Sequence, residues 1–177
     1  MNEKKVAFII CTNNDMMYSE CVTYLQRLEL PEGFDAEVIQ IKEAKSMTAG
    51  YNEGMHSTDA KYKIYLHHDL FIIRADFLKR VIEAFVEHPE IGIMGILGMD
   101  RILSDANYWN QWNVGQVYAF DVMKGYNISL DGTKDVLVEA VALDGMILMT
   151  QYDLEWREDV FTGWDFYDVS QCFEFAQ

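Results

Sequence analysis

Apolar runs that end abruptly in polar residues alternate along the chain with segments whose apolar residues recur at helical spacing. Each run carries β-branched or aromatic residues, as expected of a strand. The run at residues 6–11 is also continuously apolar, which is the pattern of a parallel strand buried on both faces. The four runs are VAFIIC (6–11), AEVIQI (36–41), YKIYL (62–66) and IGIMGIL (91–97).

Helical spacing follows the first and the third of these runs. The residues that recur are Met17, Cys21, Leu25 and Leu28, and then Phe77, Val81, Ile82, Phe85 and Val86. The polar stretch 46–57, after the second run, predicts a short helix or a loop. Strands that alternate with helices predict an α/β fold, a three-layer α/β/α sandwich around a mostly parallel sheet with right-handed crossovers.

Composition favours a single folded domain over residues 1–177. Half of the residues are hydrophobic, 14% are aromatic, and only two are proline, so the chain offers a sizeable core and no linker. No apolar run is long enough to span a membrane. The three cysteines are widely spaced and form no CxxC pair, which argues against a disulfide framework or a structural zinc site and favours a cytoplasmic location.

The formal net charge of −15 narrows the classes of partner. Nucleic acids bind mainly through Lys and Arg, so a nucleic-acid partner is disfavoured. A phosphate-bearing ligand would also be repelled at long range, and a divalent cation or local hydrogen-bond donors would have to hold it.

Polar residues follow directly after three of the predicted strands. In a parallel sheet, the carboxyl ends of the strands meet at one edge, where ligands bind. The residues expected there are Thr12, Asn13, Asn14, Glu43, His67, His68 and Asp69. Neither a GxGxxG nor a Walker A motif follows the first strand, which argues against a dinucleotide or a P-loop nucleotide site. The plain alternative is that these residues are ordinary strand ends.

Four segments carry a family resemblance through their order and spacing: FIICTNN, AGYNEG, IYLHHDLFI and ALDGMILMTQYDLEWREDVFTGWDFYDVSQCFEF. Together they resemble the nucleotide-sugar glycosyltransferases of family 2, and in particular a branch of streptomycin-biosynthesis glycosyltransferase-like proteins. The resemblance covers nearly the whole chain and implies a GT-A fold with a nucleotide-sugar donor and Mn²⁺ or Mg²⁺. Family members commonly continue past the last helix, so residues 1–177 are either a minimal GT-A domain or part of a longer protein.

The resemblance assigns metal binding to Asp69, while His67 stands where the family commonly has a first carboxylate. A divalent ion would stabilise the negative charge that develops on the diphosphate as the sugar leaves. Imidazole suits Mn²⁺ better than Mg²⁺, so a ligating His67 or His68 would favour Mn²⁺. For the histidines, contact with the nucleotide or packing are the alternatives; for Asp69 the alternative is a strand-end cap.

Two further donor contacts follow from the resemblance. Asn52 in AGYNEG matches an asparagine on the helix that faces the donor, although Tyr51 replaces the arginine that usually precedes it. The alternative is that Asn52 is a helix-breaking polar residue beside Gly54. Asp144 matches a position near the sugar.

The resemblance places the catalytic base at Asp168, where Tyr167 replaces the usual acidic neighbour. An inverting transfer needs a carboxylate that takes the proton of the acceptor hydroxyl. Asp144 and Asp165 are its rivals, and Asp165, three residues earlier and expected on roughly the same helix face, is alternatively an N-cap. Aromatic residues and amides suit a sugar ring, although Trp is often a core residue. The candidate acceptor contacts are Trp109, Trp112, Trp164 and Asp165.

These observations favour an inverting, metal-dependent glycosyltransferase. The alternative is a non-catalytic module on the same fold that binds a nucleotide-sugar or a glycan, because fold alone does not give function. A nucleotidyltransferase is a weaker third interpretation, because no Gly-rich, lysine-bearing loop follows the first strand.

Overall fold

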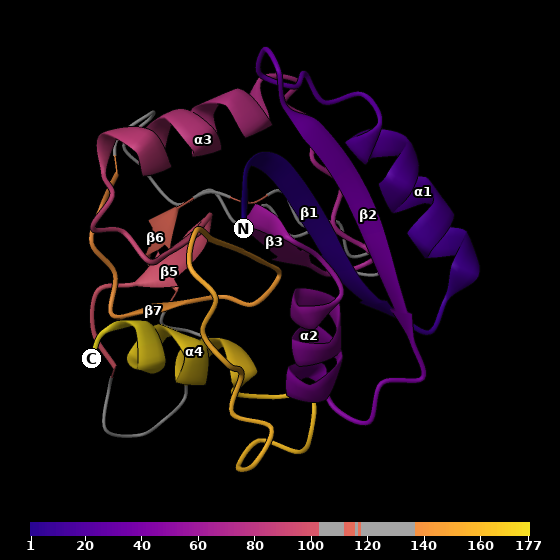
Figure 1. The fold of residues 1–177 in the computed structure, drawn as a ribbon. Helices are drawn as coiled ribbons and strands as arrows, with labels where there is room; N and C mark the ends of the chain where they lie inside the picture. The colour runs from indigo at the N-terminus through magenta and orange to yellow at the C-terminus, as the bar shows by residue number, and fades with distance from the viewer. Residues whose placement is uncertain (103–111, 116, 118–136) are drawn as a thin grey trace.

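The computed structural model describes residues 1–102, 112–115, 117 and 137–177. Figure 1 shows its elements along the chain. In order, they are β1 (Asn2–Thr12), α1 (Asp15–Leu25), β2 (Asp35–Lys42), α2 (Met47–His56), β3 (Ala60–Leu66), α3 (Phe77–Glu87), β4 (Ile93–Gly95), β5 (Leu97–Met99), β6 (Val114–Gly115), β7 (Ala142–Leu143), β8 (Ile147–Thr150) and α4 (Tyr167–Phe175).

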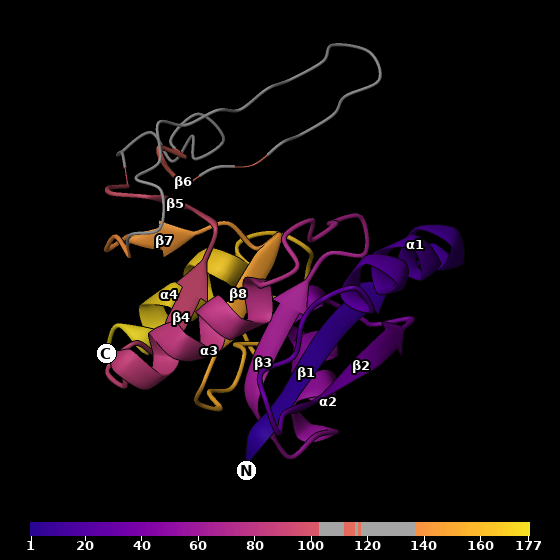
Figure 2. The ribbon, with the colours of Figure 1, turned by 90° about the horizontal axis from the view of Figure 1, so that it is seen from above.

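Among the described residues, the main sheet has five strands in the order β2-β1-β3-β8-β4. β1 runs parallel to β2 and to β3, whereas β8 runs antiparallel to both of its neighbours, β3 and β4. Four of the five strands therefore point the same way, and the predicted mostly parallel sheet is confirmed. The predicted fourth strand, residues 91–97, is wrong as one unit, because the chain leaves the main sheet after Gly95. β5 then joins a small sheet, ordered β6-β5-β7, which Figure 2 shows beyond the end of β4.

α1 and α3 cover one face of the main sheet, and α2 and α4 cover the other, which confirms the three-layer architecture (Figure 1). Side chains alternate across a strand, so β1 serves both cores. Val6, Phe8 and Ile10 pack with α1 and α3, while Ile9 and Cys11 pack with α2 and α4.

The polar stretch 46–57 contains a helix, α2. Ser46 caps its first turn by accepting a hydrogen bond from the Ala49 N–H at 3.1 Å. A Cβ at Gly54 would lie 2.3 Å from Cγ2 of Ile9, so only glycine lets α2 approach β1 this closely. None of the helices in the described ranges is long and apolar enough to cross a membrane.

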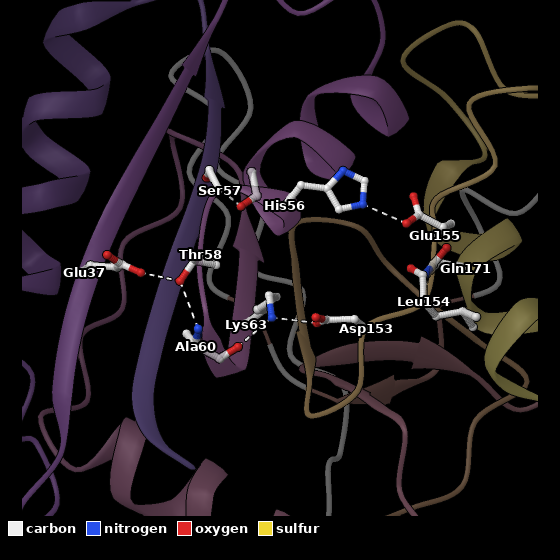
Figure 3. Close-up of polar contacts among 11 residues, drawn as sticks. Glu37, His56, Ser57, Thr58, Ala60, Lys63, Asp153, Leu154, Glu155 and Gln171 are labelled. Atoms are coloured by element: carbon white, nitrogen blue, oxygen red, sulfur yellow. Dashed lines mark hydrogen bonds and ion pairs between the residues drawn. The ribbon is translucent and has the colours of Figure 1, made fainter. Parts of the chain in front are cut away.

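After β8, residues 151–166 return across the face of the sheet that α2 and α4 cover; we call them the return segment. Figure 3 shows the contacts at its start, where the fully buried ammonium of Lys63 lies 2.6 Å from the Asp153 carboxylate and 2.6 Å from the Ala60 carbonyl. The carbonyl of Leu154 accepts a hydrogen bond from Gln171 of α4 at 2.8 Å. These contacts hold the segment on strand and helix before it reaches α4.

The return segment runs antiparallel to α2. His56, at the end of α2, lies 2.7 Å from Glu155, near the start of the segment (Figure 3). At the other end, the Met47 N–H, which opens α2, donates to the carbonyl of Gly163 at 3.1 Å. The segment therefore leads the chain back to the sheet edge where α2 begins, and α4 starts there.

Candidate active site

The carboxyl ends of the parallel strands meet at one edge of the main sheet, as the sequence predicts. β1 and β2 end in register, with Thr12 opposite Lys42, and β3 runs parallel to β1 and ends at the same edge. β8 runs the other way and starts at this edge, where Ile147 pairs with Leu66. The segment before β8 and the start of α4 therefore join the strand ends, although they are distant from them in sequence.

The polar residues at the end of β1 and directly after it mainly form the start of α1. The Thr12 hydroxyl accepts from the Asn14 N–H and lies at hydrogen-bond distance from the Asn14 carbonyl, both at 3.2 Å. Asn14 caps α1, because its Oδ1 accepts from the N–H groups of the second and third following residues. Asn13 is exposed at the edge.

Glu43, the candidate after β2, is exposed and has a φ of 57°. A non-glycine residue in this left-handed region is uncommon and costs roughly 1–3 kcal/mol. The backbone therefore turns sharply at the sheet edge directly after β2.

Asn52 is occupied by the backbone of the return segment. Its Nδ2 donates to the Trp156 carbonyl at 2.9 Å, and its Oδ1 accepts from the Trp156 N–H at 2.8 Å. Asn52 is buried, and both ends of its amide are used. The structure thus gives Asn52 a positioning contact between α2 and the return segment, in place of the helix-breaking alternative.

His67, the first residue after β3, lies against the first residue of α4. Its Nε2 is 2.6 Å from the hydroxyl of Tyr167, and its N–H donates to the carbonyl of Met146 at 3.0 Å. Burial lowers the pKa of His67, opposed by the negative charges of Asp69 and Asp168. Burial also raises the pKa of Tyr167, so the short hydrogen bond joins two neutral side chains.

Asp168, the predicted base, lies in the first turn of α4 and is only 9% exposed. Its Oδ2 accepts from the Gly145 N–H at 2.9 Å, and its Oδ1 accepts from the Val169 N–H at 2.8 Å. Burial raises the pKa of Asp168, these two hydrogen bonds oppose the rise, and the charge of Asp144 adds to it. A carboxylate with a raised pKa is a better proton acceptor at neutral pH.

Asp144 lies near Asp168, just before β8. Its Oδ1 accepts from the Met146 N–H at 2.9 Å, and its own N–H donates to the carbonyl of Leu97 in the small sheet at 2.9 Å. Burial raises the pKa of Asp144 as well, against the effect of the Met146 hydrogen bond. Two partly desolvated carboxyl groups with raised pKa values therefore lie at one site, a pattern that is common in catalytic sites.

The metal-binding candidates lie beside this group. Asp69 is exposed and His68 is half-buried. Within the described ranges, no three His, Cys, Asp or Glu side chains gather in a way that could hold a metal ion. The arrangement fits a metal held by one carboxylate and by the oxygens of a bound diphosphate, which is a common mode for Mg²⁺ in nucleotide sites. The Nε2 of His67 is hydrogen-bonded to the Tyr167 hydroxyl, so a metal could bind that nitrogen only if this bond broke.

Two expectations for Asp165 are wrong. The N-cap of α4 is Phe166, in the left-handed region at φ 62°, so Asp165 lies before the cap and shares no helix face with Asp168. Asp165 and its neighbour Trp164 are exposed, and Trp164 keeps 53% of its surface in solvent. An exposed aromatic ring beside a carboxylate can contact a sugar.

The two earlier tryptophans belong to a different part of the chain. Trp112 is half-buried next to β6 of the small sheet. Trp109 lies outside the described residues.

Sequence reasoning missed the contact that joins the two halves of the site. His67 and Tyr167 both stand where the family commonly has an acidic residue, and this double departure was the only hint of a contact that the sequence offered. The sequence does not show that the two side chains meet. Sequence reasoning also missed Gly145: a Cβ there would lie 2.2 Å from the Tyr167 hydroxyl, so glycine makes room for the hydrogen bond.

A profile described as "Glycosyltransferase like family" matches residues 7–177, whereas a comparison with curated proteins gives no match. The chain is similar to S. aureus TarS 1-349 in complex with UDP-GlcNAc, with a TM-score of 0.40 and 11% identity over 56% of this chain and 34% of that one. It is also similar to the mannosyltransferase PcManGT from Pyrobaculum calidifontis in complex with GDP-Man and Mn²⁺, with a TM-score of 0.46 and 7% identity over 84% of this chain and 44% of that one.

The chain spans less than half of the length of either solved structure. The family profile, in contrast, covers all but the first six residues and confirms the resemblance to glycosyltransferases that the ordered motifs predict. The chain belongs to the glycosyltransferase-like family.

Proposed function

We propose that the protein is an inverting glycosyltransferase that moves a sugar from a nucleoside-diphosphate donor to an acceptor hydroxyl with the help of a divalent metal. The observation that carries this proposal is the position of Asp168. Its carboxylate has a raised pKa and lies at the sheet edge beside His67, the first residue after β3, which leads to Asp69. Family membership supports the same reaction class.

In the proposed reaction, an Asp168 oxygen takes the proton of the acceptor hydroxyl while the hydroxyl oxygen attacks the anomeric carbon. The bond from that carbon to the diphosphate breaks on the opposite side, and its electron pair leaves with the diphosphate. Each oxygen of Asp168 accepts one backbone N–H and keeps a free lone pair, so the carboxylate is oriented and still able to accept a proton. A positioned general base contributes roughly a hundredfold to ten-thousandfold in rate.

Asp69 would hold the metal, which would neutralise charge on the diphosphate as it leaves. The donor is an anion and the chain has a net charge of −15, so neutralisation at the site matters more than long-range attraction. Thr12, Asn13 and Glu43 at the adjoining strand ends are the proposed contacts for the nucleoside, and Asp144 is proposed to contact the sugar. Trp164 and Asp165, which are exposed just before α4, are proposed to contact the acceptor.

A non-catalytic module that binds a nucleotide-sugar or a glycan is the second candidate. It is favoured by one observation: Asp168 is 9% exposed and bonded through both oxygens to backbone N–H groups, which is also how a purely structural carboxylate is held. Both candidates bind a nucleotide-sugar or a glycan, but only the glycosyltransferase turns the nucleotide-sugar over.

A donor screen followed by a turnover assay tests the proposal. Thermal unfolding is measured with a panel of nucleotide-sugars, each with and without Mn²⁺; a ligand at a hundred times its dissociation constant adds about 2.7 kcal/mol to the free energy of unfolding. The stabilising donor is then incubated with Mn²⁺, and release of nucleoside diphosphate is followed with and without candidate acceptors. We expect slow hydrolysis of the donor. Stabilisation without any release of nucleoside diphosphate would favour the binding module.

A further inference from the structure

One short hydrogen bond joins the segment after β3, which carries the proposed metal ligand, to the helix that carries the proposed base. The Tyr167 hydroxyl and His67 Nε2 are 2.6 Å apart, although the residues are 100 positions apart in sequence. Asp69 lies two residues after His67, and Asp168 directly follows Tyr167. The bond therefore links the two reacting halves of the site.

The hydroxyl of Tyr167 has little freedom to lie elsewhere. The side chain is buried, and its ring centre lies 5.8 Å from that of Tyr51 and 6.1 Å from that of Trp156. Gly145 leaves space for the hydroxyl that any other side chain would fill. The N–H of Gly145 also donates to Asp168. The short turn before β8 therefore contacts both Tyr167 and Asp168, the first two residues of α4.

The position of His67 is also constrained. The backbone N–H of His67 donates to the carbonyl of Met146, which continues the pairing between β3 and β8, and the side chain of His67 is half-buried. Because Nε2 meets Tyr167, a contact between that nitrogen and a donor would have to break the bond. His67 is thus better suited to act through Tyr167 than to act on the donor.

Resting on the proposed function, we propose that His67 and Tyr167 are positioning residues whose hydrogen bond fixes the end of β3, with Asp69, relative to Asp168. Asp69 would set the position of the diphosphate and hence of the anomeric carbon, and Asp168 would set the position of the attacking hydroxyl. Transfer depends steeply on the distance between them, since a misplacement of about 1 Å can lower the rate on the order of a hundredfold.

Matched variants separate the hydrogen bond from the packing of the rings. Tyr167→Phe removes only the hydroxyl. Tyr51→Phe is the control, because Tyr51 is fully buried in the same aromatic cluster and its hydroxyl has no hydrogen-bond partner in the described part of the chain. At position 67, His67→Gln places an amide about where Nε2 lies and keeps the bond, whereas His67→Asn is too short to reach Tyr167.

In the turnover assay, we expect Tyr167→Phe and His67→Asn each to lower kcat by about tenfold or more, with the KM for donor changed less than about threefold. His67→Gln should keep most of the wild-type kcat, and Tyr51→Phe should keep nearly all of it. The double variant His67→Asn/Tyr167→Phe should be no slower than either single variant, because both remove the same bond. Equal losses in Tyr51→Phe and Tyr167→Phe, or losses that multiply in the double variant, would overturn the proposal.

A second measurement needs no substrate. The amide resonances of Gly145 and Val169 report the carboxylate of Asp168, because both N–H groups donate to it. We expect His67→Asn and Tyr167→Phe to shift both resonances in the same direction, and His67→Gln to leave them near their wild-type positions. If His67→Asn left both unchanged, His67 would not position Asp168. If the shifts appeared but the wild type consumed no nucleotide-sugar, the proposed function would fail while the positioning contact stood.

Discussion

Replacing Asp168 with asparagine should separate its two roles, as a proton acceptor and as an anchor for the start of α4. Both carboxylate oxygens accept a backbone N–H, from Gly145 at 2.9 Å and from Val169 at 2.8 Å. Asparagine offers one oxygen and one NH₂ group, so one of these N–H groups would lose its acceptor and face another donor. A buried donor left unsatisfied costs about 1–3 kcal/mol.

The stability loss can be worked into a measurable quantity. For a chain of this length, 1 kcal/mol corresponds to about 2–4 °C in Tm, so Asp168→Asn should lower Tm by about 2–12 °C. The loss should lie in the lower part of this range at neutral pH, because burial raises the pKa of Asp168 and a neutral amide avoids the cost of the buried charge. Rates must therefore be compared well below the Tm of the less stable protein.

The effect on the reaction should be far larger than the effect on folding. With donor and true acceptor at saturation, we expect kcat for transfer to fall roughly a hundredfold to ten-thousandfold, while the dissociation constant for donor stays nearly unchanged. Asp165→Asn is the matched control for stability, since Asp165 is exposed before the helix and its substitution should change the free energy of unfolding by less than about 0.5 kcal/mol.

Three results would refute the assignment of Asp168 as the base. If Asp168→Asn lowered Tm but kept the wild-type kcat, the carboxylate would be an anchor only. If Asp144→Asn or Asp165→Asn lost kcat instead, the base would be one of those residues. A rise in KM for acceptor with an unchanged kcat would likewise assign Asp168 to acceptor binding.

Three further predictions concern the metal, the buried carboxyl group of Asp168, and the ion pair of Lys63 with Asp153. Asp69→Ala and EDTA should each weaken nucleoside-diphosphate binding in calorimetry, and equal affinity with and without metal in both would remove the metal from the proposal. Burial raises the folded-state pKa of Asp168 above 3.8, so the stability that this group contributes is complete below that pH and is lost as the pH rises through the raised pKa. In urea titrations, the unfolding free energy of the wild type minus that of Asp168→Asn should therefore fall from about pH 4 to pH 7, and a rise would contradict the direction of the shift. Asp153→Ala should lower the free energy of unfolding by about 2–3 kcal/mol, and by more than Lys63→Met, because it leaves a fully buried ammonium without its counter-charge, whereas the carboxylate that Lys63→Met leaves behind is 39% exposed. The reverse order of the two losses in urea titrations would contradict this.

Most strands of the main sheet could be predicted from local sequence patterns, but the order of the strands in the sheet could not. Residues 6–11, 36–41 and 62–66 form strands, because each is rich in β-branched or aromatic residues and is followed by polar residues; only the first is a continuous apolar run. β8 escaped prediction because four residues within a longer apolar stretch carry little periodicity. It enters between β3 and β4 through long-range pairing, which no local pattern encodes.

The site shows the same division between local and long-range information. Topology predicted that the ends of β1, β2 and β3 would share an edge, since that follows from parallel pairing. The hydrogen bond between Tyr167 and His67 depends on where the return segment places the start of α4. Phe166, in the left-handed region, is the N-cap of α4, so Asp168 lies in the helix and Asp165 lies before it. Both are outcomes of tertiary packing, because a non-glycine residue at positive φ persists only where its surroundings hold it there.

The neutral pair of His67 and Tyr167 also bears on how an anionic donor can approach an acidic chain. Two ionised carboxylates at these positions would add to the repulsion from a net charge of −15. Here burial keeps the imidazole uncharged and the phenol protonated, and it disfavours ionisation of Asp144 and Asp168 in the folded state. The exposed carboxylate of Asp69 is then the accessible oxygen donor at the end of β3, where a cation that arrives with the diphosphate would meet it. We therefore expect metal and diphosphate to bind together, each weakly without the other, so calorimetric titration of Mn²⁺ into the protein alone should give little heat. Tight binding of Mn²⁺ without nucleotide would show that the site holds more metal ligands than Asp69.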